Sequence, residues 1–165
     1  MDSKTIIVTL VTDRTQADVE RVRELAAKGF AAMTSDEQAE WLAGLKGAYN
    51  ASDLNRVGTA LNYLAARLSS ICGKSIAWTA KTDWAVTDIP AASQAETYRQ
   101  QIQTIRDALA YPAGTPDAPQ LARLTYIGAN DIERILALCE DLIVNVAKSF
   151  RHTGAAECAA GGLLT

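Results

Sequence analysis

The chain has 165 residues, a length that fits one domain able to bury about two thirds of its unfolded surface, and its 48% hydrophobic and 21% charged residues exclude a disordered or fibrous protein. Its formal net charge is −3, and the 16 Lys and Arg residues are scattered among 19 Asp and Glu, which excludes the clustered positive charge of a nucleic-acid-binding surface. The longest apolar run near the N-terminus, Ile6–Val8 followed by Leu10–Val11, is too short for a membrane span or a secretory signal, so we expect a soluble protein with no membrane partner.

The N-terminal segment is expected to form a short strand or an extended arm. Residues 5–12, TIIVTLVT, are rich in β-branched side chains and are followed by Asp13, a pattern typical of such segments. A single strand leaves its backbone edges unpaired. Residues 1–14 are therefore expected to pair with the C-terminal tail, with another subunit or with a preceding domain.

A helical period begins after Thr15. Apolar residues recur at steps of three and four, which predicts a helix over residues 16–33 with one face formed by Val19, Val22, Ala26, Phe30 and Met33. Thr34, with Glu37 three residues later, predicts a capping box in which each side chain bonds to the other residue's backbone N–H. The short helix that follows is expected to turn its large apolar residues inward, namely Trp41, Leu42 and Leu45.

Residues 46–68, KGAYNASDLNRVGTALNYLAARL, combine helix-start signals with a long apolar stripe. Asn50 is the expected N-cap, and Asp53 lies where the positive helix end favours an acid. Tyr49 is expected to pack on the first apolar residue of the helix as a hydrophobic staple. The apolar stripe comprises Leu54, Val57, Leu61, Leu64 and Leu68, and the small residues beside it are Gly58, Ala60 and Ala65. This pattern predicts a core helix over residues 52–71 that a neighbour can approach closely.

A long loop over residues 73–92 follows this helix and contains Trp78 and Trp84. Aromatic side chains in such loops usually hold the loop on the core. Asn55 and Asn62 lie seven residues apart and share a face of the preceding helix. We expect them to hydrogen-bond to the loop, for example to its KTDW segment, and ligand binding is the alternative.

Two further helices complete the bundle. Ser93 and Glu96 predict a second capping box, and the inward face of the helix after it is expected to comprise Tyr98, Ile102, Ile105 and Leu109. Three prolines in YPAGTPDAP then end this helix. The last helix is expected to run from Tyr126 or Ala129 to Phe150 and to occupy the centre of the bundle, because its apolar arc is wide.

These elements predict an all-α fold, a bundle of about five helices with a short N-terminal strand or arm and a long Trp-containing loop. The helical bundle is expected to form a single domain over residues 15–150. The small-residue-rich tail over residues 151–165 is expected either to be flexible or to pair with the N-terminal strand.

Few residues suggest chemistry. The three cysteines, Cys72, Cys139 and Cys158, are widely spaced, and the single histidine, His152, is expected near the negative end of the last helix. Neither a metal site, a nucleotide motif nor a cofactor site follows from them, and neighbouring acids at helix starts are explained by capping. We therefore predict a protein that is not an enzyme. An enzyme acting through Asp83, Asn130 or Asp131 is the weakest alternative.

The candidate residues for structural or interaction roles are polar and aromatic side chains near the helix starts and the loop. They are Tyr49, Asn50, Asn55, Arg56, Asn62, Trp78, Trp84, Asn130 and Asp131. A hydrogen-bond network within the fold explains the polar members best, and binding of a ligand is the alternative.

Four segments resemble a helical module that recurs in tail-region and other virion structural proteins of tailed phages and prophages of Gram-positive gut bacteria. They are VTDRTQADVERVRELAAKG, MTSDEQAEWLAGLKGAYNASDLNRVGTALNYLAARL, KTDWAVTDIP and LTYIGANDIERILALCEDLI, which together span roughly residues 11–150. The resemblance implies a helical assembly or attachment domain. The chain departs from this pattern at its early N-terminal strand and at its C-terminal GAAECAAGGLLT.

The resemblance leads us to expect a non-enzymatic structural protein of the tail, baseplate or fibre region. Such a protein would form homo-oligomers and contact other virion proteins, and it would be found in the virion and, during assembly, in the cytoplasm of the bacterial host. The alternative is a small phage-encoded binding protein that inhibits or redirects a host factor such as a defence protein.

Overall fold

Helices provide all the regular secondary structure in residues 5–161, the part of the chain that the computed structural model describes; side chains are described for residues 6–150. In chain order, the elements are α1 (Thr5–Val8), α2 (Gln16–Lys28), η1 (Phe30–Ala32), α3 (Ser35–Ala43), α4 (Ala51–Cys72), α5 (Ala92–Asp107), η2 (Leu121–Arg123) and α6 (Tyr126–Gly161). The predicted all-α fold is confirmed.

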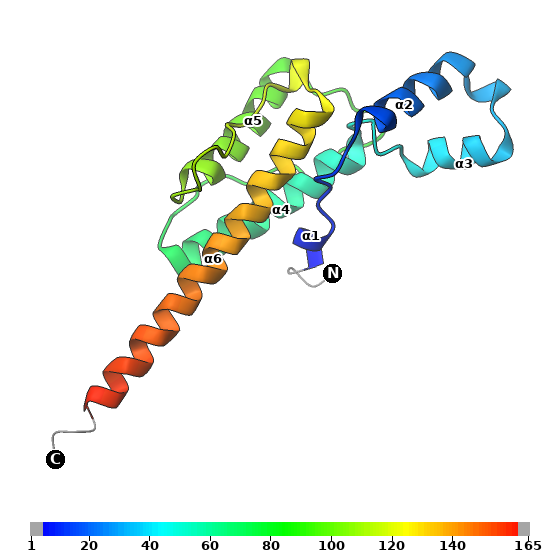
Figure 1. Cartoon of the computed structure of the whole chain (residues 1–165). Coiled ribbons are helices and arrows are strands. Elements are labelled where there is room, and N and C mark those ends of the chain that lie inside the picture. Colours follow the sequence, from blue (N-terminus) through cyan, green and yellow to red (C-terminus); the bar gives the residue numbers. More distant parts are fainter. Residues whose placement is uncertain (1–4, 162–165) are drawn as a thin grey trace.

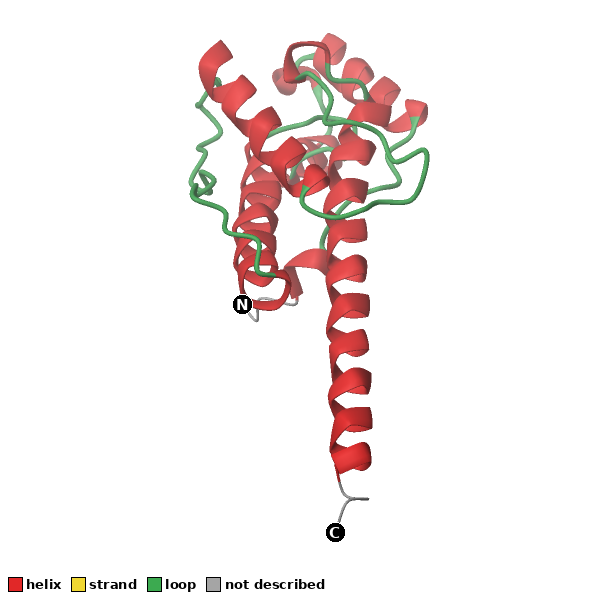
Figure 2. Cartoon of the chain, turned by 90° about the vertical axis from the view of Figure 1, so that its left-hand side faces the viewer, coloured by secondary structure: helices red, strands yellow, loops and turns green. Residues whose placement is uncertain are grey.

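The three long helices α4, α5 and α6 pack against one another and enclose the core, while α2 and α3 form a hairpin beyond one end of α4 (Figure 1). Fully buried side chains from all three long helices meet in this core: Val57, Leu61, Leu64, Leu68, Ile102, Ile105, Ile132, Ile135, Leu136 and Ile143. A second view shows the same helices with the loops around them (Figure 2).

The start of α4 follows the sequence prediction. The Asn50 side chain accepts hydrogen bonds from the backbone N–H groups of Ser52 at 2.9 Å and Asp53 at 3.4 Å. In return, the Asp53 carboxylate accepts the Asn50 N–H at 2.9 Å, so the N-terminal capping box is complete. The predicted apolar stripe of α4 is buried along its whole length. Cap and stripe together explain why this segment is the longest regular element of the bundle before α6.

The N-terminal segment is an arm, and the strand alternative is wrong for its described residues. Residues 5–8 form the single turn α1, which contacts α4 and α6, and residues 9–15 then run in irregular conformation to α2. Ile6 is buried in the core. A β-branched run can therefore form a helical turn instead of a strand when its side chains pack on neighbouring helices.

The α2–α3 hairpin differs from the prediction in two ways. The expected helix over residues 16–33 ends at Lys28, because Gly29 adopts a left-handed φ of 75°, and a short 3₁₀ turn follows. The Thr34 capping box forms, but Trp41 and Leu42, expected to face inward, are 36% and 74% exposed. The reason is that α3 lies outside the bundle core, so no third helix covers this face.

The ends of the last two long helices also differ from the sequence prediction. The capping box expected at Ser93 is wrong, because α5 begins at Ala92 and the Gln94 side chain accepts the Ala91 N–H at 2.9 Å. Helix α6 begins at Tyr126 and continues to Gly161, well beyond its expected end at Phe150.

The expected C-terminal tail lies largely within this longer helix. Its residues are helical up to Gly161, while residues 162–165 lie outside the described residues. The side chain of His152, expected at a helix end, is also outside the described side chains.

Replacing Leu64 by Ala should lower the free energy of unfolding by about 2–5 kcal/mol, because Leu64 is fully buried and its loss leaves a cavity. Asn50→Ala, which removes only the cap, should cost about 1 kcal/mol. Leu42→Ala is the matched control, since this leucine is 74% exposed and its truncation should change stability little. Urea denaturation measures all three; a larger loss for the cap than for Leu64 would contradict the assigned core.

Candidate functional site

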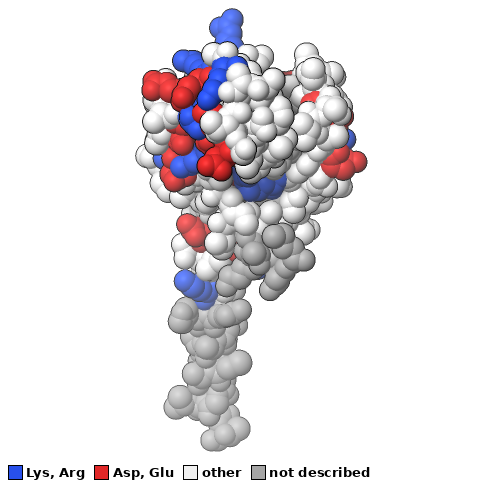
Figure 3. Space-filling model, turned by 90° about the vertical axis from the view of Figure 1, so that its right-hand side faces the viewer, with Lys and Arg blue, Asp and Glu red and all other residues white. Residues whose placement is uncertain are grey.

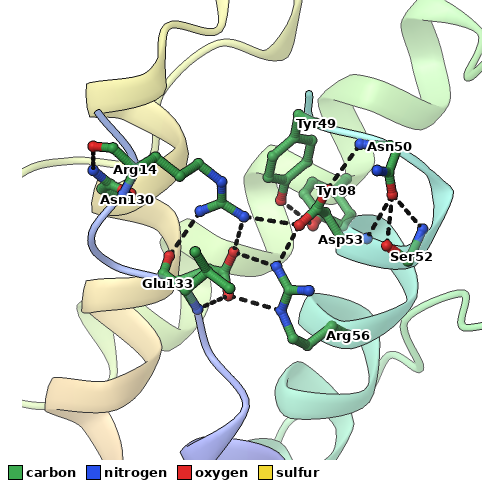
Figure 4. Close-up of polar contacts among 10 residues, drawn as sticks. Arg14, Tyr49, Asn50, Ser52, Asp53, Arg56, Tyr98, Asn130 and Glu133 are labelled. Atoms are coloured by element: carbon green, nitrogen blue, oxygen red, sulfur yellow. Dashed lines mark hydrogen bonds and ion pairs between the residues drawn. The ribbon is translucent and has the colours of Figure 1, made fainter. Parts of the chain in front are cut away.

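A largely buried network of four charged side chains joins the N-terminal arm to α4 and α6 (Figure 4). The Arg14 guanidinium of the arm lies 2.8 Å from the Asp53 carboxylate of α4 and 2.6 Å from the Glu133 carboxylate of α6. Arg56 of α4 bonds to Glu133 at 2.9 and 2.8 Å and also to Asp53. Glu133 is fully buried, and Arg14 and Asp53 are 4% and 5% exposed.

The network is electrically balanced, with two guanidinium groups and two carboxylates. Burial disfavours a charged Arg56, but its hydrogen bonds and Coulomb attraction to Glu133 and Asp53 more than offset this, and the pKa of Arg56 lies above its ordinary value. These paired charges hold the arm, α4 and α6 in one arrangement. The cluster therefore fixes the position of the arm on the bundle.

Glu133 also bonds to the backbone of the arm. Its second carboxylate oxygen accepts the Val11 N–H at 2.6 Å, while the Arg14 side chain donates to the Val11 carbonyl at 2.7 Å. The irregular arm thereby satisfies backbone groups that would otherwise be buried without partners. One carboxylate on α6 thus replaces the pairing strand that an extended N-terminal segment would need.

Three asparagines act as clamps, which we define as side-chain amides that bond to both the N–H and the C=O of one residue in an irregular segment. Asn130 accepts the Arg14 N–H and donates to the Arg14 carbonyl, both at 2.9 Å. Asn55 bonds in the same way to Trp84, at 2.7 and 2.9 Å, and Asn62 bonds to Ala80, at 2.7 and 3.0 Å. Each amide imitates one residue of a pairing strand, because it offers one donor and one acceptor.

The predicted hydrogen bonds between Asn55, Asn62 and the loop are therefore confirmed. Their seven-residue spacing on α4 corresponds to two helical turns, and it is matched by the four-residue step between Ala80 and Trp84 on the extended loop. Both are buried, Ala80 at 4% and Trp84 at 7% exposure.

Gly58 of α4 lies between the two loop clamps and allows the loop to approach the helix closely. A Cβ atom at this position would lie 2.2 Å from the Lys81 carbonyl oxygen, so no other residue fits without moving the loop. The Lys81 ammonium group sits 4.8 Å from the centre of the Trp84 ring. Trp78 is half-buried against the core, whereas Ile89 further along the loop is 91% exposed.

The remaining candidate residues have separate structural roles. The Tyr49 hydroxyl bonds to the Tyr98 hydroxyl at 2.8 Å, and the Arg14 guanidinium lies 5.6 Å from the centre of the Tyr49 ring. Desolvation raises the pKa of both tyrosines well above the usual value, so both stay protonated. Asp131 is half-buried near Arg134, with 3.9 Å between their charged atoms.

The structure brings some of the predicted residues together and separates others. Tyr49, Asn50, Arg56 and Asn130 all lie at the charged network or bond directly to its members (Figure 4). Asp83, named with Asn130 for a possible enzyme, is an 84% exposed side chain on the loop that pairs with Lys81 at 2.8 Å. Burial raises the pKa of Cys139 to about 11, which keeps this core thiol protonated.

Sequence reasoning missed Arg14 and Glu133, the two residues at the centre of the network. Arg14 pairs with Asp53 across 39 positions and with Glu133 across 119, so no local spacing reveals the contacts. One signal was available: Glu133 lies between Ile132 and Leu136 in the wide apolar arc of α6. A charged residue on a buried face usually has a partner.

A groove of about 450 Å³ opens at the α2–α3 end of the molecule. It lies between α3, the start of α4 and the loop over residues 86–90, and its large apolar lining residues are Val22, Trp41, Leu42, Leu45, Leu54 and Val86. Asp88 is its one charged lining residue. From this end of the molecule, charged atoms gather along one side of the surface and uncharged atoms fill much of the rest (Figure 3).

Among the described residues, no group of three or more His, Cys, Asp and Glu side chains is arranged to hold a metal ion. No helix within the same part of the chain combines the length and apolar character needed to cross a membrane. No family model matches the chain, and no curated protein or solved structure matches it either.

Replacing Glu133 by Ala should lower the free energy of unfolding by about 3–5 kcal/mol, because the buried Arg14 and the half-buried Arg56 would lose their shared carboxylate. Glu24→Ala removes an ion pair to Arg21 whose carboxylate is 63% exposed, and it should cost about 1 kcal/mol or less. Denaturant unfolding of the two variants provides the comparison. Equal losses would show that the network contributes no more than a surface pair.

Asn55→Ala should cost about 1–3 kcal/mol, because the Trp84 N–H and C=O both lose their partner. The matched control is Asn145→Ala on α6, where the asparagine is exposed. Thermal unfolding and the emission of the loop tryptophans report stability and loop position, respectively. If Asn55→Ala behaved like Asn145→Ala, the clamp would not hold the loop.

Proposed function

We propose that this chain is a non-enzymatic assembly protein of a tailed-phage virion, from the tail, baseplate or fibre region. In this proposal it acts by forming homo-oligomers and by docking to other virion proteins. It would be present in the finished particle and, before that, in the cytoplasm of the infected or lysogenic bacterium. The phage context comes from the sequence resemblance, which spans roughly residues 11–150.

One structural observation carries the assembly role: large apolar side chains are exposed at both ends of the molecule. At one end, Leu42 and Val86 are 74% and 96% exposed beside the groove. At the other end, α6 extends past the bundle, and Phe150 is 65% exposed (Figure 1). Exposed apolar groups gathered at such places are typical of protein–protein contact sites.

The polar candidates support the same proposal, since their bonds are directed into the fold. Asn55, Asn62 and Asn130 each bond to the backbone of an irregular segment. Arg56 bonds to two carboxylates of the fold, those of Asp53 and Glu133. These side chains make the scaffold rigid, and a rigid scaffold holds its exposed apolar surfaces in fixed positions, which favours tight association.

Mass spectrometry of density-purified phage particles is the experiment that tests this role. We expect peptides of this chain at a stable ratio to known structural proteins, and a host cytoplasmic enzyme serves as the contamination control. Absence from particles, together with a pull-down from host lysate that returns one host protein in a 1:1 ratio, would contradict the proposal. That result would favour the alternative, a binding protein directed at a host factor.

A further inference from the structure

We propose that a cleft between α5 and the clamped loop binds one neutral sugar ring. The cleft has a volume of about 220 Å³ and is lined by the first half of α5 and by residues 79–84 of the loop; we call it the α5 cleft. Trp84, Tyr98 and Gln101 are its buried lining residues, and its other lining residues are polar and exposed, so it opens to the surface. Sugar binding goes beyond the proposed assembly role and does not depend on it.

The side chain of Gln101 is the observation that points to a ligand. Gln101 lines the cleft and is 7% exposed, yet no described residue forms a hydrogen bond with its amide. A glutamine amide has two N–H donors and a carbonyl acceptor, and buried groups of this kind are normally paired. A ligand in the cleft that offers both a donor and an acceptor would satisfy this amide.

A second unpaired group borders the same cleft. The indole N–H of Trp84 is buried and has no hydrogen-bond partner among the described residues, whereas the Trp84 backbone is held by the Asn55 clamp. Buried indole N–H groups usually have a partner. Because this N–H is enclosed, we assign the direct contact with the ligand to Gln101, and the indole serves as a reporter of binding.

The α5 side of the cleft presents a row of hydrogen-bonding groups. Ser93, Thr97 and Gln101 follow one another at four-residue steps and therefore share one face of the helix. The Thr97 hydroxyl donates to the Ser93 carbonyl at 2.9 Å and can still accept, while no described residue bonds to the Ser93 hydroxyl. This side of the cleft thus offers both donors and acceptors to a ligand.

The loop side of the cleft is held in place by the asparagine clamps. Thr79 and Lys81 line the cleft on either side of Ala80 in the chain, and Asn62 bonds to the Ala80 backbone at 2.7 and 3.0 Å. Trp84, at the end of the same stretch, is held by the second clamp. A preformed site loses less freedom when a ligand binds, so the clamps favour binding in this cleft.

The lining residues carry no unpaired charge. Lys81 is the one charged residue among them, and its ammonium group lies 2.8 Å from the Asp83 carboxylate and 4.0 Å from that of Asp88. An anionic ligand would compete with these carboxylates for Lys81, and a cationic ligand would meet no acidic lining residue. The charges of the cleft therefore favour a neutral ligand.

A sugar ring fits this combination of size, charge and hydrogen-bonding groups. The cleft is smaller than the roughly 300–1,000 Å³ of sites that hold drug-sized molecules, so its ligand is small. Each hydroxyl of a sugar can donate and accept, as the hydroxyls and the amide of the cleft require. A site that hydrogen-bonds the hydroxyls of its ligand discriminates strongly against analogues that lack them.

Titration with neutral sugars tests the proposal, and the probes are glucose, galactose, mannose and N-acetylglucosamine. Amide NMR spectra follow the side-chain amide of Gln101 and the indole N–H of Trp84. We expect at least one sugar to shift both signals with a Kd on the order of 1 mM, a typical affinity for a ligand of this size. Cyclohexanol has a ring of the same size with a single hydroxyl and should bind about tenfold more weakly or worse.

Methyl glycosides of the same sugars form a second arm of the titration. A glycoside that binds as tightly as the free sugar indicates a sugar residue at the end of a glycan chain. A free sugar that binds while its glycoside does not indicates a free sugar as the ligand.

Gln101→Leu removes the unpaired amide and keeps a side chain of similar size. It should weaken sugar binding about tenfold or more, while the urea midpoint of unfolding stays the same or rises, because the amide has no described partner to lose. Gln100→Leu is the matched control: Gln100 is exposed, precedes Gln101 on α5 and does not line the cleft. This variant should bind sugar like the natural sequence.

Three results would overturn the sugar site. If no sugar of either arm shifts the two signals, the cleft holds water only. If cyclohexanol binds as tightly as the best sugar, the cleft is an unselective pocket. If folded Gln101→Leu binds sugar as tightly as the natural sequence, the amide is not part of a site.

Discussion

The buried carboxylate of Glu133 is the interaction on which the arrangement of the arm depends. It lies on α6, accepts from Arg14 and Arg56, and also accepts the Val11 N–H, so it links the arm, α4 and α6 at one point. A buried charge is costly unless it is paired and hydrogen-bonded, and here the partners of Glu133 come from two other segments, the arm and α4. The ion pairs therefore make the fold more specific, because the buried charged groups all have partners only when the arm, α4 and α6 are in place.

The asparagine clamps hold segments without secondary structure in place in a similar way, by giving their backbone groups hydrogen-bond partners. The loop over residues 73–91 has no neighbouring strand in the described part of the chain, and α4 offers Asn55 and Asn62 as substitutes that bond to the backbone of Trp84 and Ala80. Gly58 between them removes the Cβ that would hold the loop away. An all-helical protein can thus fix long irregular segments by side-chain amides. The result is a rigid body whose exposed apolar ends keep a fixed relation to each other.

The elements that were predictable from the sequence are those governed by local patterns. The α4 cap at Asn50 and its leucine stripe depend on residues a few positions apart, and the seven-residue spacing of Asn55 and Asn62 indicated their shared partner. Arg14 and Glu133 were not predictable, because their pairing is set by the packing of distant helices. The exposure of Leu42 was missed for a related reason. An apolar helix face indicates that burying the face is favourable, but it does not indicate which other part of the protein covers it.

Native-state amide hydrogen exchange tests the central claim most directly, because the clamps make a residue-specific prediction. The amides of Arg14, Ala80 and Trp84 lie in irregular segments, yet they should exchange as slowly as amides inside α4, since each is bonded to a clamp or held by the network. Exchange of these three amides at the rate of an unstructured chain would contradict the account.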